Sequence, residues 1–347
     1  MRCLPQCSTE YSLHGTVHHI VHDASYMRLV LEDLNQALRN PAQPLRPHLP
    51  FELWADMYHS LRDSPRATLE VDWHVKRLAN LHLHRKALYP PARVARQATT
   101  ETPDGLDYGW DAPALLTLKQ HHPHITASVV LKAAMALVNI TRTRHTHALF
   151  SNFEAARAHF PFWPNTLRHL PGPGGDGLAL ADLDASDVGG PTMNAVTNLI
   201  EVPHNERALD FLSRIQAEQT ELTKRSHAPW RRIMEKLDAL HPGEAAEEII
   251  PETHQTQFLT WVPGFLGDYE KIRVVQIAIR AALGLVFVAG LGGPQATTYM
   301  ISLRWDAVNY SRDEVEKFVK DVEMAVGWLL EGDNWALPVG DFLKKLT

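Results

Sequence analysis

The sequence has almost no cysteine and no long apolar run. Cys3 and Cys7 are the only cysteines in 347 residues, so a disulfide scaffold is excluded, and we expect two reduced thiols. The most apolar segment runs only from Ala281 to Leu291, well short of the roughly 20 residues that a membrane-spanning helix needs. Residues 1–23 also lack the apolar core of a secretory signal. We therefore expect a cytoplasmic protein that does not enter the membrane.

The sequence also lacks an excess of positive charge. Lys and Arg number 34 and Asp and Glu number 40, which gives a formal net charge of −6. Proteins that bind nucleic acids or anionic membranes usually carry a basic surface, so neither partner is predicted. Apolar residues make up 45% and charged residues 21%, which is typical of a folded globular protein. What is abundant is histidine, with 20 residues.

Hydrophobic periodicity predicts a mixed α/β fold. Apolar residues at every second position predict a strand over residues 11–21. Repeats close to 3.6 residues predict helices at 25–38, 51–61, 69–81, 111–120, 127–140, 207–224, 230–240 and 311–329. Further strands are expected at 147–153, 196–202, 257–262, 283–289 and 298–305. Strands and helices are interleaved without the regular βαβ order of a doubly wound sheet.

Histidines gather at the end of the first predicted strand, and three hypotheses compete for them. His14, His18 and His22 recur at every fourth residue, but on a strand they would extend over about 26 Å and could not share one metal ion. A histidine on an apolar strand face is often a packed core residue. Alternatively, His19 is a general base for acyl transfer, and Asp23 holds the following turn by pairing with Arg or backbone N–H groups. The spacing alone leaves the choice open.

The residues His18-His19-x-x-x-Asp23 resemble the HHxxxD motif of the condensation domains of nonribosomal peptide synthetases. Coenzyme-A acyltransferases also carry HxxxD, so the short pattern is moderately specific. Further segments resemble this family in the same order along nearly the whole chain, at 25–38, 73–78, 125–141, 188–202, 227–230 and 305–329. Each segment is a weak match, but the ordered series favours the family strongly.

The resemblance implies a chloramphenicol-acetyltransferase-like fold, in which a mixed sheet is flanked by helices and two lobes form a V around a tunnel. His19 would be the catalytic residue, as a general base or as a group that positions the nucleophile. His18 would support it, and Asp23 would be structural. Residues expected along the substrate channel are Gly190, Pro191, Asn194 and Trp261.

The function implied is acyl transfer in secondary metabolism. A phosphopantetheine-tethered acyl or peptidyl thioester, delivered by a carrier domain, would be joined to an amine or alcohol acceptor, with no bound cofactor and no metal. One alternative is a freestanding acyltransferase that uses acyl-coenzyme A. Another is an inactive remnant or partner subunit that binds carrier domains without turnover.

The sequence departs from the family pattern at its start. The family places most of a lobe before the motif, whereas here the motif begins at residue 18. Residues 1–62 are therefore expected to be a remnant of the N-terminal lobe, and residues 63–347 the C-terminal lobe. The Arg-rich segment that might pair with Asp23 is missing, so we expect Asp23 to lack that partner. Half a tunnel does not exclude water. Three alternatives follow: a truncated gene product, a fragment that self-association or a second chain completes, or a divergent enzyme. The sequence does not decide among them.

Overall fold

Six strands form the mixed sheet around which most of the chain is built. The computed structural model describes residues 21–90, 104–162, 184–244, 246–262, 269–272 and 284–346, together with the backbone of four short strands at 2–6, 10–14, 169–170 and 178–179. The sheet has the order β3-β10-β9-β8-β4-β7. Its strands are β3 (Asp104–Asp111), β4 (His147–Glu154), β7 (Asn194–Glu201), β8 (Gln257–Trp261), β9 (Leu285–Gly292) and β10 (Thr298–Trp305). Strand β8 runs parallel to β4 and β9, and the other pairs are antiparallel. The predicted mixed α/β class is confirmed.

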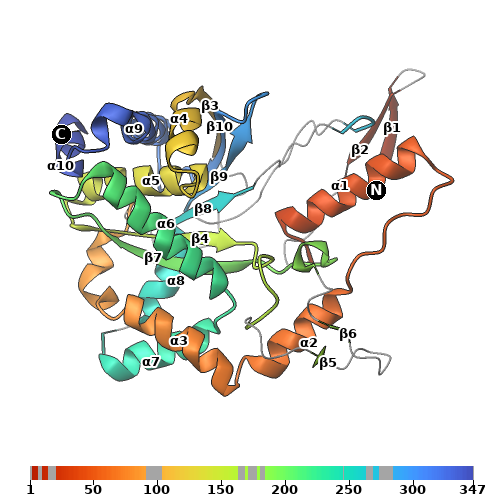
Figure 1. Ribbon diagram of the computed structural model, residues 1–347, viewed down its shortest axis with the longest axis horizontal. Coiled ribbons are helices and arrows are strands. Elements are labelled where there is room, and N and C mark those ends of the chain that lie inside the picture. Colours follow the sequence, from red (N-terminus) through yellow and green to blue (C-terminus); the bar gives the residue numbers. More distant parts are fainter. Residues whose placement is uncertain are drawn as a thin grey trace.

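Helices cover both faces of this sheet (Figure 1). One face carries α4 (Ala114–His121), α5 (Ala127–Thr143), α6 (Ala208–Lys224), α9 (Arg312–Leu330) and α10 (Val339–Leu346). The other carries α3 (Pro65–Arg77), the 3₁₀ helix η2 (Leu81–Ala87), α7 (Trp230–Leu240) and α8 (Ala246–Thr256). Successive side chains of β4 point to opposite faces of the sheet. Phe150 therefore packs in the core on the α5 side, and Leu149 packs in the core on the α8 side.

Helix α5 forms the centre of the larger core. Every residue from Val129 to Ile140 is buried, as expected for a helix that is apolar on nearly all sides. Its N-terminus is fixed by the Thr126 side chain, which accepts a hydrogen bond from the backbone N–H of Val129. The helix therefore contributes buried apolar surface to the sheet and to its neighbouring helices at once.

The N-terminal elements lie beside the sheet, beyond the end of β8 (Figure 1). Strands β1 (Arg2–Gln6) and β2 (Glu10–His14) form an antiparallel pair, and α1 (Ala24–Arg39) and α2 (Phe51–Leu61) follow. Helix α2 packs through Trp54 and Met57 against Phe160 and Val188. Shorter elements are β5 (His169–Leu170), β6 (Leu178–Ala179), η4 (Ala185–Asp187) and η5 (Gly332–Asn334). Within the described ranges, no helix has the length and apolar character required to cross a membrane.

Several predicted boundaries differ from the structure. The predicted strand over 11–21 corresponds to β2, which ends at His14; residues 15–20 lie outside the described residues, and Val21 lies beyond the strand and is 54% exposed. The helix predicted at 69–81 is α3, which begins earlier, at Pro65, because the Ser64 side chain accepts from the Ala67 N–H and proline suits the first helical turn. Strand β3 and helices α8 and α10 were not predicted.

Candidate functional site

Asp23, the last residue of the HHxxxD pattern, starts helix α1. Its backbone is extended, and its Oδ1 accepts a hydrogen bond from the backbone N–H of Tyr26 at 2.7 Å. Aspartate is among the most favourable residues at this capping position, because it satisfies a backbone donor that the helix leaves unpaired. Asp23 is only 2% exposed, so its charge requires further partners inside the protein.

Those partners come from the sheet-bearing part of the chain. Nη2 of Arg157 lies 3.0 Å from Oδ1 and 3.3 Å from Oδ2 of Asp23. The backbone N–H of Thr192 donates to Oδ2 at 2.9 Å. Both charged side chains are almost fully buried. Burial lowers the pKa of the Arg157 guanidinium, and the Asp23 carboxylate opposes that effect.

Arg157 also holds the loop that leads into β7. Its Nη1 donates to the Val188 carbonyl at 2.5 Å, and its Nη2 donates to the Gly190 carbonyl. The same loop packs closely on α2, because a Cβ at Gly190 would lie 2.6 Å from the Phe51 ring. One guanidinium thus joins the start of α1 to the loop that contains Gly190 and Pro191, both predicted channel residues.

Asp23 pairs with an arginine and with backbone N–H groups, as predicted for an aspartate at this turn. The arginine comes from the loop after β4 rather than from a segment before the motif, 134 residues from Asp23 in the sequence. Periodicity and local spacing carry no information on a contact of this range. The only sequence signal was chemical, since an aspartate at a buried turn requires an arginine or several backbone donors.

Of the remaining predicted site residues, the structure describes some and not others. His18 and His19 lie outside the described residues, so their roles remain predictions. Asn194 begins β7, and its side-chain amide donates to the Ser226 carbonyl. Trp261 ends β8 and packs edge-to-face on Tyr299, with 6.2 Å between ring centroids. Asp23, Gly190 and Pro191 are therefore brought together around Arg157, whereas Trp261 contacts the helix-covered core.

A buried polar network lies at the end of β4, next to Asn194 in the register of the sheet. Lys132 Nζ donates to Gln219 Oε1 at 2.7 Å, and Gln219 Nε2 donates to Glu154 Oε1 at 2.8 Å. Burial lowers the pKa of Lys132 to about 8 and raises the pKa of Glu154. None of the residues in this network was predicted as a site residue. The network links α5, α6 and the strand that leads into Arg157.

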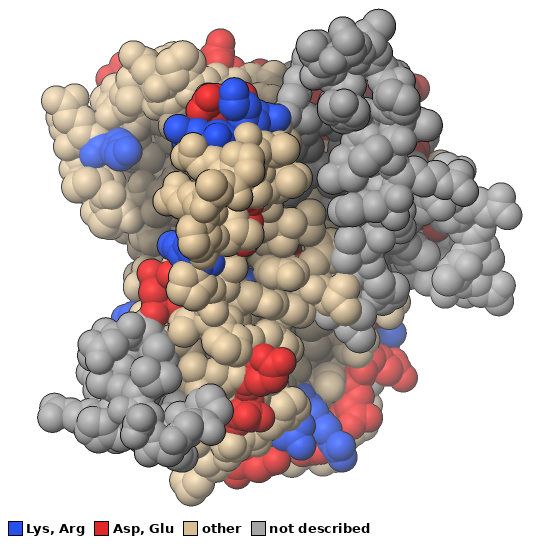
Figure 2. All heavy atoms as spheres, turned by 90° about the vertical axis from the view of Figure 1, so that its right-hand side faces the viewer, with Lys and Arg blue, Asp and Glu red and all other residues tan. Residues whose placement is uncertain are grey.

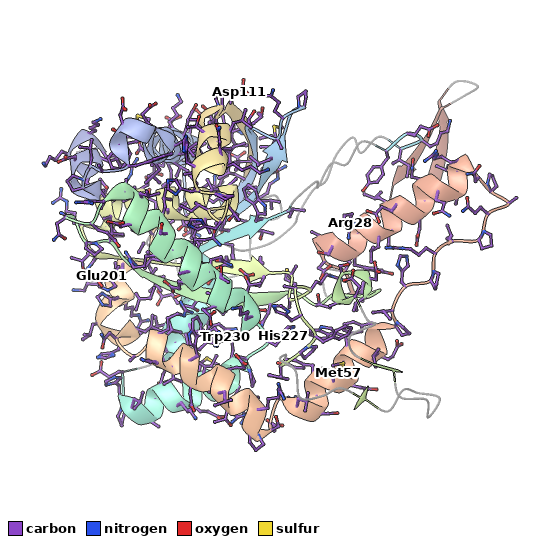
Figure 3. The ribbon with its side chains drawn as sticks, viewed as in Figure 1. Arg28, Met57, Asp111, Glu201, His227 and Trp230 are labelled. Atoms are coloured by element: carbon purple, nitrogen blue, oxygen red, sulfur yellow. The ribbon has the colours of Figure 1, made fainter. Side chains whose placement is uncertain are left out.

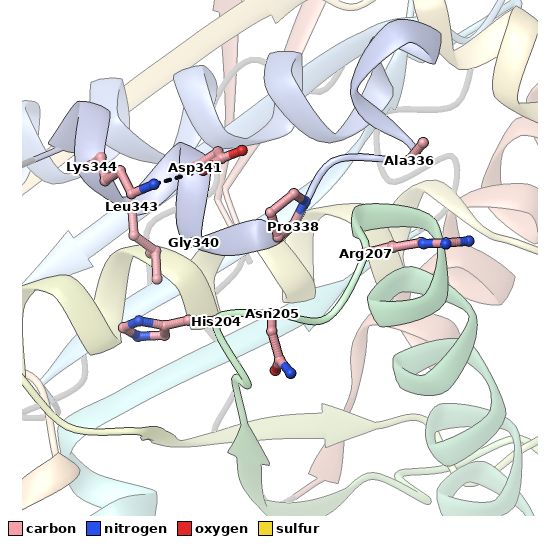
Figure 4. A pocket seen from close by; sticks show the side chains of 9 residues that line it. All are labelled: His204, Asn205, Arg207, Ala336, Pro338, Gly340, Asp341, Leu343 and Lys344. Atoms are coloured by element: carbon pink, nitrogen blue, oxygen red, sulfur yellow. Dashed lines mark hydrogen bonds and ion pairs between the residues drawn. The ribbon is translucent and has the colours of Figure 1, made fainter.

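A groove of about 630 Å³ lies between the turn after β7 and α10, at the end of the molecule away from α1 (Figures 1 and 4). It is lined by His204, Asn205, Arg207, Ala336, Pro338, Gly340, Asp341, Leu343 and Lys344, none of which was predicted as a site residue. In the face drawn in Figure 2, acidic and basic side chains are interspersed on the described part. Among the side chains that the structure describes, no group of three or more His, Cys, Asp or Glu is arranged to hold a metal ion.

Comparison with solved structures identifies the fold of the chain. No protein-family model and no curated protein matches the chain. Among solved structures, the epimerization domain from the third module of tyrocidine synthetase B matches with a TM-score of 0.59 and 14% identity, over 90% of this chain and 68% of that chain. The starter condensation domain of rhizomide synthetase, solved in complex with C8-CoA, matches with a TM-score of 0.65 and 12% identity, over 93% and 66%.

A further match is the first condensation domain of the calcium-dependent antibiotic synthetase in complex with a substrate analogue, with a TM-score of 0.59 and 14% identity, over 94% of this chain and 67% of that chain. The chain has the condensation-domain fold. It spans about two thirds of the length of these domains. The resemblance predicted from the HHxxxD pattern and the ordered segments is thereby confirmed for the fold.

Proposed function

We propose that this condensation-fold chain is an acyltransferase that joins a thioester-bound acyl or peptidyl group to an amine or alcohol. The observation that carries the proposal is the buried ion pair between Asp23 and Arg157. It ties the last residue of the HHxxxD pattern to the Gly190–Pro191 loop within a condensation-domain fold. A donor on a phosphopantetheine arm, delivered by a carrier domain, is the proposed substrate, and no metal or bound cofactor takes part.

The proposed chemistry is a single acyl transfer. The acceptor nitrogen or oxygen attacks the thioester carbonyl and forms the new C–N or C–O bond, and the C–S bond breaks. His19 takes the proton from the acceptor as it attacks, or holds the acceptor in place, and the proton ends on the departing thiol. Histidine suits this role because its ordinary pKa lies near neutral pH.

Asp23 is proposed to orient rather than to react. Its carboxylate accepts from the Tyr26 and Thr192 N–H groups and from Arg157, so its oxygens are already engaged. A carboxylate held in this way fixes the turn that follows His19 and the entry of α1. The proposed division of roles is therefore chemistry at His19 and geometry at Asp23, with His18 in support.

The test is transfer of an octanoyl group to a panel of amines and alcohols, followed by mass spectrometry of the product and by release of free thiol. The donors are an octanoyl-loaded carrier domain and octanoyl-coenzyme A, each assayed with wild type, His19→Ala and the control His14→Ala. Loss of a general base costs about 10²–10⁴ in rate. Equal rates for wild type and His19→Ala would remove His19 from the reaction.

The alternative donor, acyl-coenzyme A, has one specific observation in its favour, since a solved domain with this fold contains C8-CoA. Transfer from octanoyl-coenzyme A with no carrier domain present favours a freestanding acyltransferase. Transfer only from the loaded carrier favours the condensation-type reaction. Carrier binding that persists in His19→Ala, with no product from either donor in wild type, identifies a partner subunit without turnover.

We also propose that residues 1–62 correspond to the edge of a first lobe and residues 63–347 to the second. Val30 and Leu38 of α1 are 39% and 53% exposed, and a partner that covers α1 would bury them. A second copy or another chain would be this partner. Sedimentation of the 347-residue chain separates a monomer from a self-associated form.

A further inference from the structure

Ala156 adopts a backbone conformation that alanine disfavours. Its φ is +52°, in the left-handed region, where an L side chain crowds the following carbonyl. Ala156 directly precedes Arg157, so its conformation sets the direction in which the arginine leaves the backbone. Such a residue keeps this conformation only where surrounding contacts hold it there.

His227 supplies such a contact. Its Nε2 lies 3.0 Å from the Ala156 carbonyl oxygen, and since a carbonyl only accepts, Nε2 carries the proton. Nδ1 is buried and has no hydrogen-bond partner within the described chain. Burial lowers the pKa of His227 to about 4, so the ring is neutral at pH 7. Within the described residues, the one hydrogen bond of the ring is therefore the bond from Nε2–H to the carbonyl of the strained residue.

Aromatic side chains fix the ring in this orientation. The His227 ring lies 5.9 Å from the Trp54 ring of α2 and 6.4 Å from the Phe162 ring. Figure 3 shows His227 on the side of the helical layer that faces α2. Packing of this kind determines the rotamer and leaves the Nε2–H directed at one acceptor.

We propose that His227 is a positioning residue that holds Ala156 in its left-handed conformation and thereby places the Arg157 guanidinium on Asp23. The link runs from the imidazole N–H to the Ala156 carbonyl, through the Arg157 backbone, to the carboxylate that closes the HHxxxD pattern. The inference deepens the proposed function. It rests on that function only where it assigns the Asp23–Arg157 ion pair a role in acyl transfer. The contact itself is testable without any assay of activity.

The chain contains a matched control in His74. Its Nε2 lies 3.0 Å from the Arg225 carbonyl, its Nδ1 is also buried without a partner, and burial lowers its pKa to about 3. His74 is 1% exposed and His227 3%. The two histidines share burial, neutrality and a single bond to a carbonyl, but only His227 bonds to the loop that presents Arg157.

The readout is hydrogen exchange at the backbone N–H of Thr192, which donates directly to Asp23. A glutamine at position 227 places its amide nitrogen near the position of the imidazole Nε2, whereas the shorter asparagine does not. We expect His227→Gln to keep Thr192 protected and His227→Asn to exchange about tenfold faster, after correction for global stability, as for one buried carbonyl left unsatisfied. His74 contacts the Arg225 carbonyl at the start of the turn that carries His227, so His74→Asn should raise the corrected Thr192 rate less than His227→Asn does.

Ala156→Gly provides the rescue, because glycine adopts positive φ without steric cost. In His227→Asn, this second substitution should return Thr192 protection to within about twofold of wild type, and it should restore folding if the single variant does not fold. The inference is overturned if Thr192 exchanges equally in His227→Asn and His74→Asn. It is also overturned if the double variant fails to fold or leaves Thr192 unprotected. Inactivity of the wild type with every thioester would instead count against the proposed function alone.

Discussion

Arg157→Met is predicted to cause a large loss of stability, because it breaks the buried ion pair with Asp23. It removes the charge that compensates Asp23 while Asp23 stays 2% exposed, and it removes the donors to the Val188 and Gly190 carbonyls. Breaking a buried ion pair by removing one partner costs about 3–5 kcal/mol. The Tyr26 and Thr192 N–H groups still bond to Asp23, so we expect a loss near the lower end, about 3 kcal/mol.

Urea unfolding followed by tryptophan fluorescence measures this loss through the midpoint and slope of the transition. The double variant Asp23→Asn/Arg157→Met removes both charges, and we expect it to be about 1–2 kcal/mol more stable than Arg157→Met, because no buried charge is left unpaired. Arg231→Met is the control. Its ion pair with Glu235 is exposed and should contribute about 0.5 kcal/mol or less. An Arg157→Met loss as small as the control, or additive losses at positions 23 and 157, would refute the reasoning.

Two further predictions concern a histidine pair and two glycines. The rings of His84 and His147 stack 3.8 Å apart, and burial lowers the pKa of both. Below the unfolded-state pKa of about 6.5, the unfolded chain therefore binds more protons than the folded protein, and the free energy of unfolding falls as pH falls. We expect His147→Gln to lose less unfolding free energy than wild type between pH 7.5 and pH 5.5 in urea titrations, and an equal loss would contradict this. Gly190→Ala should destabilise by about 1–3 kcal/mol because its Cβ meets Phe51. Gly327→Ala, where a Cβ meets open space inside α9, should stabilise by about 0.5–1 kcal/mol, and thermal unfolding of both variants distinguishes their opposite signs.

Sequence periodicity predicted the elements whose apolar residues face one core. The helices predicted at 51–61 and 230–240 coincide with α2 and α7, and the strand predicted at 298–305 coincides with β10. In these segments the spacing of apolar residues follows directly from which side is buried. Local sequence was sufficient there because no long-range contact changes the pattern.

The elements that were missed have a sequence that conflicts with their structure. Strand β3 contains Gly105 and Gly109 and three aspartates, residues that strands disfavour, and it forms because it pairs along its length with β10 at the edge of the sheet. Helix α8 contains Pro251 in its interior, which normally ends a helix, and it is held by buried Ile249 and Ile250 against the smaller core. In both elements, tertiary contacts outweigh the local preference of the sequence.

The candidate site likewise has a part that the sequence predicted and a part that it did not. The burial of Asp23 at a turn, and its need for an arginine or backbone donors, followed from the chemistry of its pattern. Arg157 and His227 did not, because the first reaches Asp23 across 134 residues and the second reaches Ala156 across 71. Contacts of that range depend on how the loop after β4 lies on α1 and α2, which only the folded chain specifies.

The most direct test of the central claim is the rate of octanoyl transfer from a loaded carrier domain to an amine or alcohol, compared between wild type and His19→Ala. The account predicts product from wild type and a rate about 10²–10⁴ lower in the variant, with His14→Ala close to wild type. Equal rates in wild type and His19→Ala, with both proteins folded, would contradict it.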